Sequence, residues 1–133
     1  KSYAGKWVVL YFYPKDMTPG CTQEACDFRD NVNRLAAADA AVFGISADDE
    51  KRHAKFVAKE SLTFPLLADT DHVVCDAYGV WQKKKFMGRE YDGIVRTTLI
   101  ISPAGDIAKR YDEVKVSGHV EEVLKALAEL QKK

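Results

Sequence analysis

The sequence predicts an α/β fold with a mixed central β-sheet flanked by helices on both faces. Residues 7–13 are an apolar run of β-branched and aromatic side chains without polar alternation, which is typical of a strand covered on both faces. Amphipathic helical patterns follow this strand and a second buried strand at 41–46, so two βα units come first. A third buried strand at 96–101 continues through a turn into residues 107–111, which adds an antiparallel hairpin.

The first strand ends at Pro14, because proline cannot donate to a β-ladder. Residues 15–20 are rich in turn-forming types and predict a loop. After this loop, apolar side chains recur at spacings of four and three residues, which predicts an amphipathic helix from near Cys21 to about Ala38. The members of the apolar stripe are Cys21, Ala25, Phe28, Val32 and Leu35.

The second strand leads into a helix whose start carries negative charge at 48–50, the sign that the helix dipole favours. A short extended piece at 64–67 comes next. Asp69 or Thr70 is expected to cap the short helix that follows, and Gly79 is expected to end it.

In the last third of the chain, the lysine run at 83–85 is interpreted as a solvated loop rather than a binding patch. The turn at 102–106 joins the third strand to the hairpin strand. A final helix presents apolar side chains on one face between Val120 and Leu130. Because no linker, repeat or low-complexity segment interrupts the chain, residues 1–133 are expected to form a single domain.

The composition limits the classes of function. Twenty Lys and Arg residues balance twenty Asp and Glu residues, so no global positive field attracts nucleic acid or an anionic membrane. The longest apolar run, at 7–13, is far shorter than the roughly 18 residues of a membrane-spanning helix. Neither nucleic acid nor a membrane is therefore an expected partner.

The chain begins at Lys1 and carries no charged-then-apolar leader. We expect the protein in the cytoplasm, or in an organelle if a targeting segment has been removed. Its three cysteines are too few for a disulfide-stapled scaffold and too scattered for a structural zinc site, so no metal is expected. Reactive cysteine chemistry is the more natural use of these thiols.

Cys21 is the strongest candidate for such chemistry. It lies in the first turn of a predicted helix that follows a turn-rich loop, where unpaired backbone N–H groups and the helix dipole stabilise an anion. This environment favours a nucleophilic thiolate. The alternative is an inert cysteine on the apolar stripe, because free cysteine often serves as a small core hydrophobe.

Three kinds of thiol chemistry fit the surrounding residues poorly. A thioredoxin-type exchange site needs a second cysteine three residues on, where the chain has Glu24. A phosphatase loop needs arginine six residues on, where the chain has Asp27. A thiol protease needs a positioned histidine. The three histidines all lie away from the expected strand ends: His53, His72 and His119.

The segment 11–29, Tyr-Phe-Tyr-Pro-Lys-Asp-Met-Thr-Pro-Gly-Cys-Thr-Gln-Glu-Ala-Cys-Asp-Phe-Arg, closely resembles the active site of the peroxiredoxins, specifically the bacterioferritin comigratory protein (peroxiredoxin Q) subfamily. The pattern Pro-x-x-x-Thr-x-x-Cys is met at Pro14, Thr18 and Cys21. The resemblance extends over nearly the whole chain, through residues 64–69, 78–80 and 93–101.

The resemblance implies a thioredoxin-like fold and a thiol-dependent peroxidase that reduces hydrogen peroxide and organic hydroperoxides in antioxidant defence. It implies a monomer that needs no metal, haem or flavin, because sulfur performs the redox step and thioredoxin or a glutaredoxin-type dithiol regenerates it. Members of this family normally carry a further N-terminal segment, so the domain is expected to lack that segment ahead of Lys1.

The resemblance also implies roles for individual residues. Cys21 is the peroxidatic cysteine, and the Thr18 hydroxyl and the backbone N–H groups of Gly20 and Cys21 donate hydrogen bonds to the peroxide. Arg96 supplies fixed donors and a permanent charge. Pro14 shields the sulfur from water.

Glu24 is expected to hold the Arg96 guanidinium in place. The alternative is that it is a solvated carboxylate in the first turn of the helix. For Arg96 the alternative is an ion-pair residue on the surface at the start of a strand.

Cys26 is expected to resolve the sulfenic acid that peroxide leaves on Cys21. Five residues along an intact helix separate two Cα atoms by about 8.6 Å, beyond the roughly 7 Å limit for a disulfide, so the helix start must unwind. Cys75 is the alternative resolving residue, although a buried structural role suits it better. Two rival functions remain: a disulfide exchanger without peroxidase activity, and a redox-sensing or chaperone-like binding module.

Overall fold

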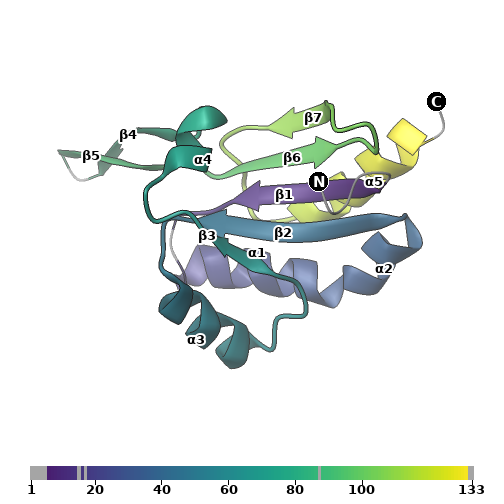
Figure 1. Cartoon of the computed structure of the whole chain (residues 1–133), viewed down its shortest axis with the longest axis horizontal. Coiled ribbons are helices and arrows are strands. Elements are labelled where there is room, and N and C mark those ends of the chain that lie inside the picture. Colours follow the sequence, from purple (N-terminus) through teal and green to yellow (C-terminus); the bar gives the residue numbers. More distant parts are fainter. Residues whose placement is uncertain (1–5, 15, 17, 87, 132–133) are drawn as a thin grey trace.

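The structure is a computed structural model and describes residues 6–14, 16, 18–86 and 88–131. Figure 1 shows the order of its elements along the chain. They are β1 (Trp7–Phe12), α1 (Pro19–Asp30), α2 (Val32–Ala37), β2 (Ala40–Ser46), α3 (Glu50–Glu60), β3 (Leu66–Ala68), α4 (Val73–Ala77), β4 (Trp81–Phe86), β5 (Arg89–Ile94), β6 (Thr97–Ile101), β7 (Ile107–Tyr111) and α5 (His119–Gln131).

The central sheet has five strands in the order β3-β2-β1-β6-β7. Strands β1, β2 and β3 run parallel, whereas β6 pairs antiparallel with both β1 and β7. The predicted mixed sheet, with the run at 7–13 at its centre, is therefore confirmed. In the β1–β6 pairing Phe12 lies opposite Thr97, so the loop that leaves β1 and the residue that precedes β6 meet at one edge of the sheet.

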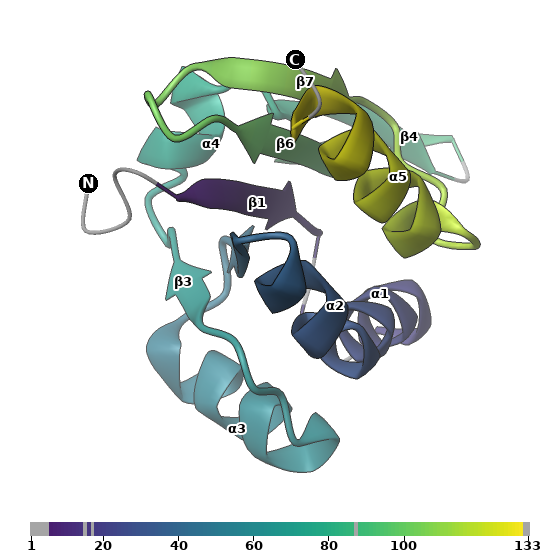
Figure 2. The ribbon, with the colours of Figure 1, turned by 90° about the vertical axis from the view of Figure 1, so that its right-hand side faces the viewer.

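Each face of the sheet packs against its own hydrophobic core. The larger core joins alternate β1 side chains, such as Val9 and Tyr11, to residues of α1, α2, α3 and α5. The smaller core joins Leu10 and Phe12 of the same strand to α4 and to the base of the β4–β5 hairpin. Figure 2 shows α1, α2 and α5 on one side of β1 and α4 on the other. The prediction of helices on both faces is confirmed.

The long helix expected to run to about Ala38 is in fact two helices, so this prediction is wrong in its extent. The chain breaks at Asn31, where φ is −115° and ψ is 11°. The Asn31 side chain donates from Nδ2 to the carbonyl oxygen of Asp27 at 2.8 Å and accepts from Arg34 through Oδ1 at 2.9 Å. This local side-chain bonding competes with the regular helix pattern and separates α1 from α2.

The start of α3 agrees with the prediction, whereas the residue that precedes α4 is not one of the two predicted. Asp49 caps α3 by accepting a hydrogen bond from the backbone N–H of Arg52 at 2.8 Å. The residue before α4 is His72 rather than Asp69 or Thr70. The Asp69 carboxylate nevertheless accepts from the N–H of Cys75 at 2.8 Å, because its loop folds back over the first turn of the helix.

The lysine run predicted as a solvated loop belongs instead to strand β4, which pairs antiparallel with β5 in a separate two-stranded sheet. The base of this hairpin is buried through Val80 and Ile94. A run of lysines has no alternation of apolar and polar residues, so it gives no signal that would predict a strand. Figure 1 shows the hairpin projecting beyond the central sheet.

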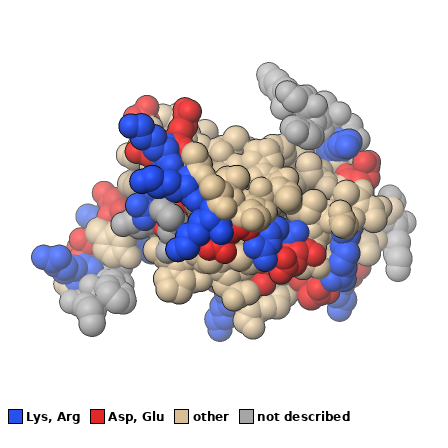
Figure 3. Space-filling view, turned by 90° about the horizontal axis from the view of Figure 1, so that it is seen from below, with Lys and Arg blue, Asp and Glu red and all other residues tan. Residues whose placement is uncertain are grey.

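Figure 3 shows the surface from below, where basic and acidic side chains lie next to one another rather than in one patch of either sign. This mixture agrees with the balanced charge of the sequence. Within the described residues, no helix is both long enough and apolar enough to span a membrane.

Candidate active site

Cys21 lies in the first turn of α1 and is 1% exposed. Pro19, at the first helical position, has no N–H group to leave unsatisfied, and its fixed φ suits a helix start. Thr18 precedes the helix in an extended conformation, and its carbonyl oxygen accepts from the N–H of Thr22 at 2.8 Å. The first turn of α1 therefore contributes the partial positive charge of a helix start close to Cys21.

Arg96 brings a full positive charge to the same place. It lies between β5 and β6, and its backbone is held by a hydrogen bond from Val114 N to its carbonyl oxygen at 2.9 Å. Its Nη2 donates to Cys21 Sγ at 3.3 Å, and its Nη1 donates to Glu24 Oε1 at 2.6 Å. The guanidinium thus bridges a sulfur and a carboxylate on one face of α1. It is not the exposed ion-pair residue considered as the alternative, because its side chain is 16% exposed.

Glu24 is buried rather than solvated, since only 1% of its side chain is exposed. Burial raises the pKa of Glu24 to about 7, although the charge and the hydrogen bond of Arg96 act in the opposite direction. Its second oxygen, Oε2, accepts no hydrogen bond from the described part of the chain. The negative charge on this carboxyl group is therefore held mainly by the Arg96 guanidinium.

Gly20 borders the Arg96 guanidinium, and Pro14 lies earlier in the loop that precedes α1. A Cβ atom on Gly20 would lie 3.2 Å from Arg96 Nη2, so glycine lets the guanidinium approach the start of the helix closely. Pro14 is half-buried at the bend that follows β1. Residues 15 and 17 of this loop lie outside the described residues, whereas Asp16 is completely buried.

Cys26 lies on the same helix but in a different environment. It is partly exposed, and its Sγ donates to Glu60 Oε1 of α3 at 3.4 Å. Burial and this hydrogen bond raise the pKa of the Cys26 thiol. Next to it, Arg29 Nη1 donates to the carbonyl oxygen of Glu60 at 2.6 Å. Two contacts to one residue therefore tie the middle of α1 to the end of α3.

Cys75 lies on the other side of the central sheet. It is completely buried in the smaller core, whereas Cys21 belongs to the larger one. Burial and a hydrogen bond to Asp69 raise the pKa of the Cys75 thiol well above its ordinary value. The described residues hold no group of three or more His, Cys, Asp or Glu side chains arranged to bind a metal ion.

Two features near this site were not predicted from the sequence. Lys84, in the run predicted as solvated, is half-buried and donates from Nζ to the carbonyl oxygen of Ile94 at 2.9 Å. Burial and the nearby charge of Arg96 lower the pKa of Lys84. The second feature is a hydrogen-bonded cluster of Tyr13, Asp16 and His53 beneath the loop, for which the only sequence signal was an acidic residue inside the turn-rich segment.

The geometry defines a thioredoxin-like α/β domain in which a cysteine at the amino end of a helix contacts an arginine. The sequence pattern of the AhpC/TSA family matches residues 1–110. The chain is 49% identical over 131 residues to Peroxiredoxin Bcp of Bacillus subtilis, covering 98% of this chain and 83% of that protein. It is 47% identical over 127 residues to Peroxiredoxin Bcp of Escherichia coli K12, covering 96% and 81%.

Solved structures agree with these relatives. The structure of the Xanthomonas campestris bacterioferritin comigratory protein matches with a TM-score of 0.91 and 42% identity over 96% of this chain and 81% of that one. A Xylella fastidiosa PrxQ structure matches with a TM-score of 0.94 and 40% identity over 98% and 80%. The chain therefore belongs to the AhpC/TSA family and is a peroxiredoxin of the Bcp, or peroxiredoxin Q, group.

The Glu24→Gln variant should oxidise more slowly with peroxide, by about threefold to tenfold, because an amide holds the Arg96 guanidinium less firmly than a carboxylate does. The rate constant of Cys21 oxidation in a single turnover measures this effect. Glu121→Gln is the matched control, since Glu121 forms an exposed ion pair with Arg34. Equal rates in the two variants would show that Glu24 does not support the site.

Glu24 should also leave a signature in stability against pH. Because its folded pKa, about 7, lies above the ordinary value of 4.5, its protonation stabilises the fold below about pH 4.5 and that contribution is lost as pH rises through 7. Urea unfolding at pH 5 and pH 8 should therefore show a smaller pH dependence in Glu24→Gln than in the wild type.

Proposed function

We propose that this peroxiredoxin reduces hydrogen peroxide and organic hydroperoxides with Cys21 and regenerates Cys21 through an intramolecular disulfide with Cys26. The observation that carries this proposal is the 3.3 Å contact from Arg96 Nη2 to Cys21 Sγ at the start of α1. A thiolate accepts such a charge-assisted hydrogen bond more strongly than a thiol does. In addition, the related bacterioferritin comigratory protein of Xanthomonas campestris has alkyl peroxide reduction activity.

In the first step the Cys21 thiolate attacks one peroxide oxygen, an S–O bond forms and the O–O bond breaks. The cysteine becomes a sulfenic acid, and the other oxygen leaves as hydroxide or alkoxide and takes up a proton. Arg96, Thr18 and the N–H groups of Gly20 and Cys21 supply donors to the two oxygens as charge develops on them. Pro14 limits the access of water to the sulfur.

In the second step the Cys26 sulfur attacks the sulfenic sulfur, and water leaves as the disulfide forms. In an intact helix the two Cα atoms are about 8.6 Å apart, so the start of α1 must unwind. Moving Cys26 toward Cys21 breaks the contact from Cys26 Sγ to Glu60 Oε1. This contact holds Cys26 in place while α1 is intact.

Cys75 is a less suitable partner for Cys21. Its sulfur is buried among the side chains of the smaller core, on the opposite face of the central sheet. A Cys21–Cys75 bridge would require α4 to leave this core. The Cys21–Cys26 bridge requires only a local rearrangement at one helix end, and helix ends open at low free-energy cost.

Two further parts of the proposal concern partners. A dithiol protein, thioredoxin or a glutaredoxin-type reductant, returns the disulfide to two thiols, because thiol–disulfide exchange requires an external pair of thiols. The cycle needs no other subunit, because both reacting cysteines lie on α1, and we propose that the chain acts as a monomer.

Cys21→Ser should abolish peroxide reduction and keep the fold, because an alcohol is a far weaker nucleophile than a thiolate at neutral pH. The measurement is the consumption of one equivalent of peroxide by reduced protein alone, with circular dichroism to verify folding. Peroxide consumption by the folded variant at the wild-type rate would contradict the proposal. So would wild-type protein that reduces protein disulfides but leaves peroxide unchanged, since that is the behaviour of a disulfide exchanger.

The serine variants of the other two cysteines should separate their roles. Cys26→Ser should permit one fast oxidation, stop reductant-driven turnover and promote sulfinic acid formation on Cys21. Cys75→Ser, the matched control, should leave turnover nearly unchanged. After one equivalent of peroxide, thiol blocking and digestion, mass spectrometry should identify a Cys21–Cys26 peptide. A dominant Cys21–Cys75 peptide would transfer the resolving role to Cys75.

A further inference from the structure

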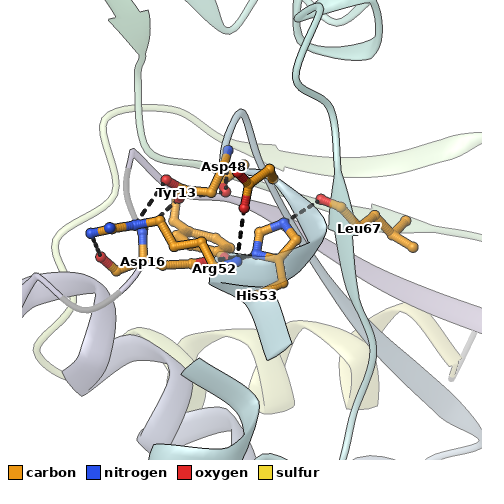
Figure 4. Close-up of polar contacts among 8 residues, drawn as sticks. Tyr13, Asp16, Asp48, Arg52, His53 and Leu67 are labelled. Carbon is orange, nitrogen blue, oxygen red and sulfur yellow. Dashed lines mark hydrogen bonds and ion pairs between the residues drawn. The ribbon is translucent and has the colours of Figure 1, made fainter. Parts of the chain in front are cut away.

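A buried polar cluster lies directly beneath the loop that leads to Cys21 (Figure 4). Its centre is Asp16, which lies between Pro14 and Thr18 in the sequence and is completely buried. The Tyr13 hydroxyl donates to Asp16 Oδ1 at 2.5 Å, and His53 Nδ1 lies 2.6 Å from Asp16 Oδ2. One carboxylate oxygen is therefore held by the residue that directly follows β1 and the other by a residue of α3.

The two ring nitrogens of His53 both face acceptors. Nδ1 faces Asp16 Oδ2, and Nε2 lies 3.1 Å from the carbonyl oxygen of Leu67 in β3. A neutral imidazole donates through only one nitrogen, so satisfying both contacts requires the doubly protonated, positively charged ring. Burial lowers the pKa of His53, but the hydrogen bond and charge of Asp16 outweigh it and raise the pKa above its ordinary value. Burial and Asp16 also raise the pKa of Tyr13, so its hydroxyl stays protonated.

The backbone of Asp16 is held as firmly as its side chain. Its N–H donates to Asp48 Oδ2 at 2.7 Å, and its carbonyl oxygen accepts from Arg52 Nη2 at 3.1 Å. Asp48 itself is fixed by Ser46 Oγ, which donates to the same Oδ2 at 2.8 Å, and by Arg52 Nε at 3.3 Å from Oδ1. The charged and titratable groups around His53 are therefore Asp16 and Tyr13 from the loop side, Asp48 from the β2–α3 connection and Arg52 from its own helix.

This cluster connects the active-site loop to two other parts of the fold. Asp16 belongs to the loop after β1, His53 to α3, and Leu67 to β3. The same loop carries Pro14 at one end and, at the other, Thr18, which precedes the first turn of α1. A displacement of Asp16 therefore moves the residues that border Cys21.

We propose that His53 is a positioning residue for peroxide reduction: its ring fixes Asp16 and thereby holds the neighbouring residues Pro14 and Thr18 where they orient the peroxide at Cys21. The proposal rests on the peroxidase function proposed above. His53 does not touch the sulfur or the peroxide. It acts through Asp16 by fixing the position of the residues that orient the peroxide. The rate of a reaction in a preorganised site depends strongly on such positions.

The protonation state of His53 gives this role a pH dependence with a definite sign. A histidine whose folded pKa is raised stabilises its surroundings below its unfolded pKa, and this contribution is lost as pH rises through the folded pKa. When His53 loses a proton, one of its two contacts, to Asp16 or to Leu67, is lost. The loop should then orient peroxide less well at high pH.

The test separates orientation from thiolate formation by measuring two rates at each pH from 6 to 9. The rate of Cys21 oxidation by hydrogen peroxide depends on both, whereas the rate of alkylation by iodoacetamide needs no peroxide orientation. At pH 6.5 the ratio of the oxidation rate to the alkylation rate should be at least about fivefold lower in His53→Gln than in the wild type. As the pH rises from 6 to 9, this ratio should decrease in the wild type and stay constant in His53→Gln.

Two further variants make the result decisive. His72→Gln is the matched control, because His72 Nδ1 also lies near a carboxylate, 2.8 Å from Asp76, but on the exposed start of α4. Its ratio should equal that of the wild type. Tyr13→Phe removes only the hydroxyl that donates to Asp16 and should lower the ratio in the same direction, so it decides the question if His53→Gln does not fold.

A purely structural role would lower the urea midpoint of His53→Gln or Tyr13→Phe and leave the rate ratio unchanged, and this outcome would overturn the proposal. Nitrogen-15 NMR of the histidine rings should show both His53 nitrogens protonated at pH 6, and a neutral ring there would also overturn it. Wild-type protein that does not react with peroxide would refute the peroxidase function itself. Active wild type with unaffected variants would refute only the role of His53.

Discussion

The site depends on one guanidinium that touches two groups of the same helix. Arg96 reaches α1 from the connection between β5 and β6 and donates to Cys21 Sγ and Glu24 Oε1. This contact is available because β1 and β6 are paired with Phe12 opposite Thr97, which brings the loop after β1 and the residue before β6 to one edge of the sheet. The glycine at position 20 then allows the close approach. The antiparallel pairing at the centre of the fold is thus what positions the charge at the sulfur.

The central sheet also gives the three cysteines three different environments. Cys21 lies in the larger core beside a fixed cation, Cys26 lies on the partly exposed side of the same helix beside Glu60, and Cys75 lies in the smaller core on the other face. The raised pKa values of Cys26 and Cys75 follow from burial in both cases and from the neighbouring carboxylates. The Glu60 carboxylate beside Cys26 favours the thiol over the thiolate at this position.

Elements with a strong apolar pattern were predictable from the sequence. The run at 7–13 is the central strand, and the stripe that contains Cys21, Ala25 and Phe28 is buried in α1 as expected. The break at Asn31 was missed because side-chain bonding to a backbone carbonyl leaves the apolar spacing unchanged. The β4 strand was missed because its run of lysines gives no alternation of apolar and polar residues.

The site was predictable only where its residues are close in the chain or carry the family pattern. Pro14, Thr18, Gly20, Cys21 and Glu24 lie within one short segment. The cluster beneath them was not predictable, because Asp16 and His53 are 37 residues apart and meet only when α3 packs below the loop. A histidine that is set aside for lying far from the strand ends can still reach the active-site loop from a helix.

The central claim is that the fixed donors of Arg96, and not only its charge, activate Cys21 toward peroxide. The most direct measurement compares single-turnover oxidation by hydrogen peroxide in the variants Arg96→Lys and Arg110→Lys. Arg110 is the control because it lies in β7 and forms an ion pair with Asp112. We predict a rate constant at least about tenfold lower for Arg96→Lys, because lysine keeps the charge but loses the planar pair of donors. Arg110→Lys should match the wild type. Equal rate constants in both variants would contradict the account.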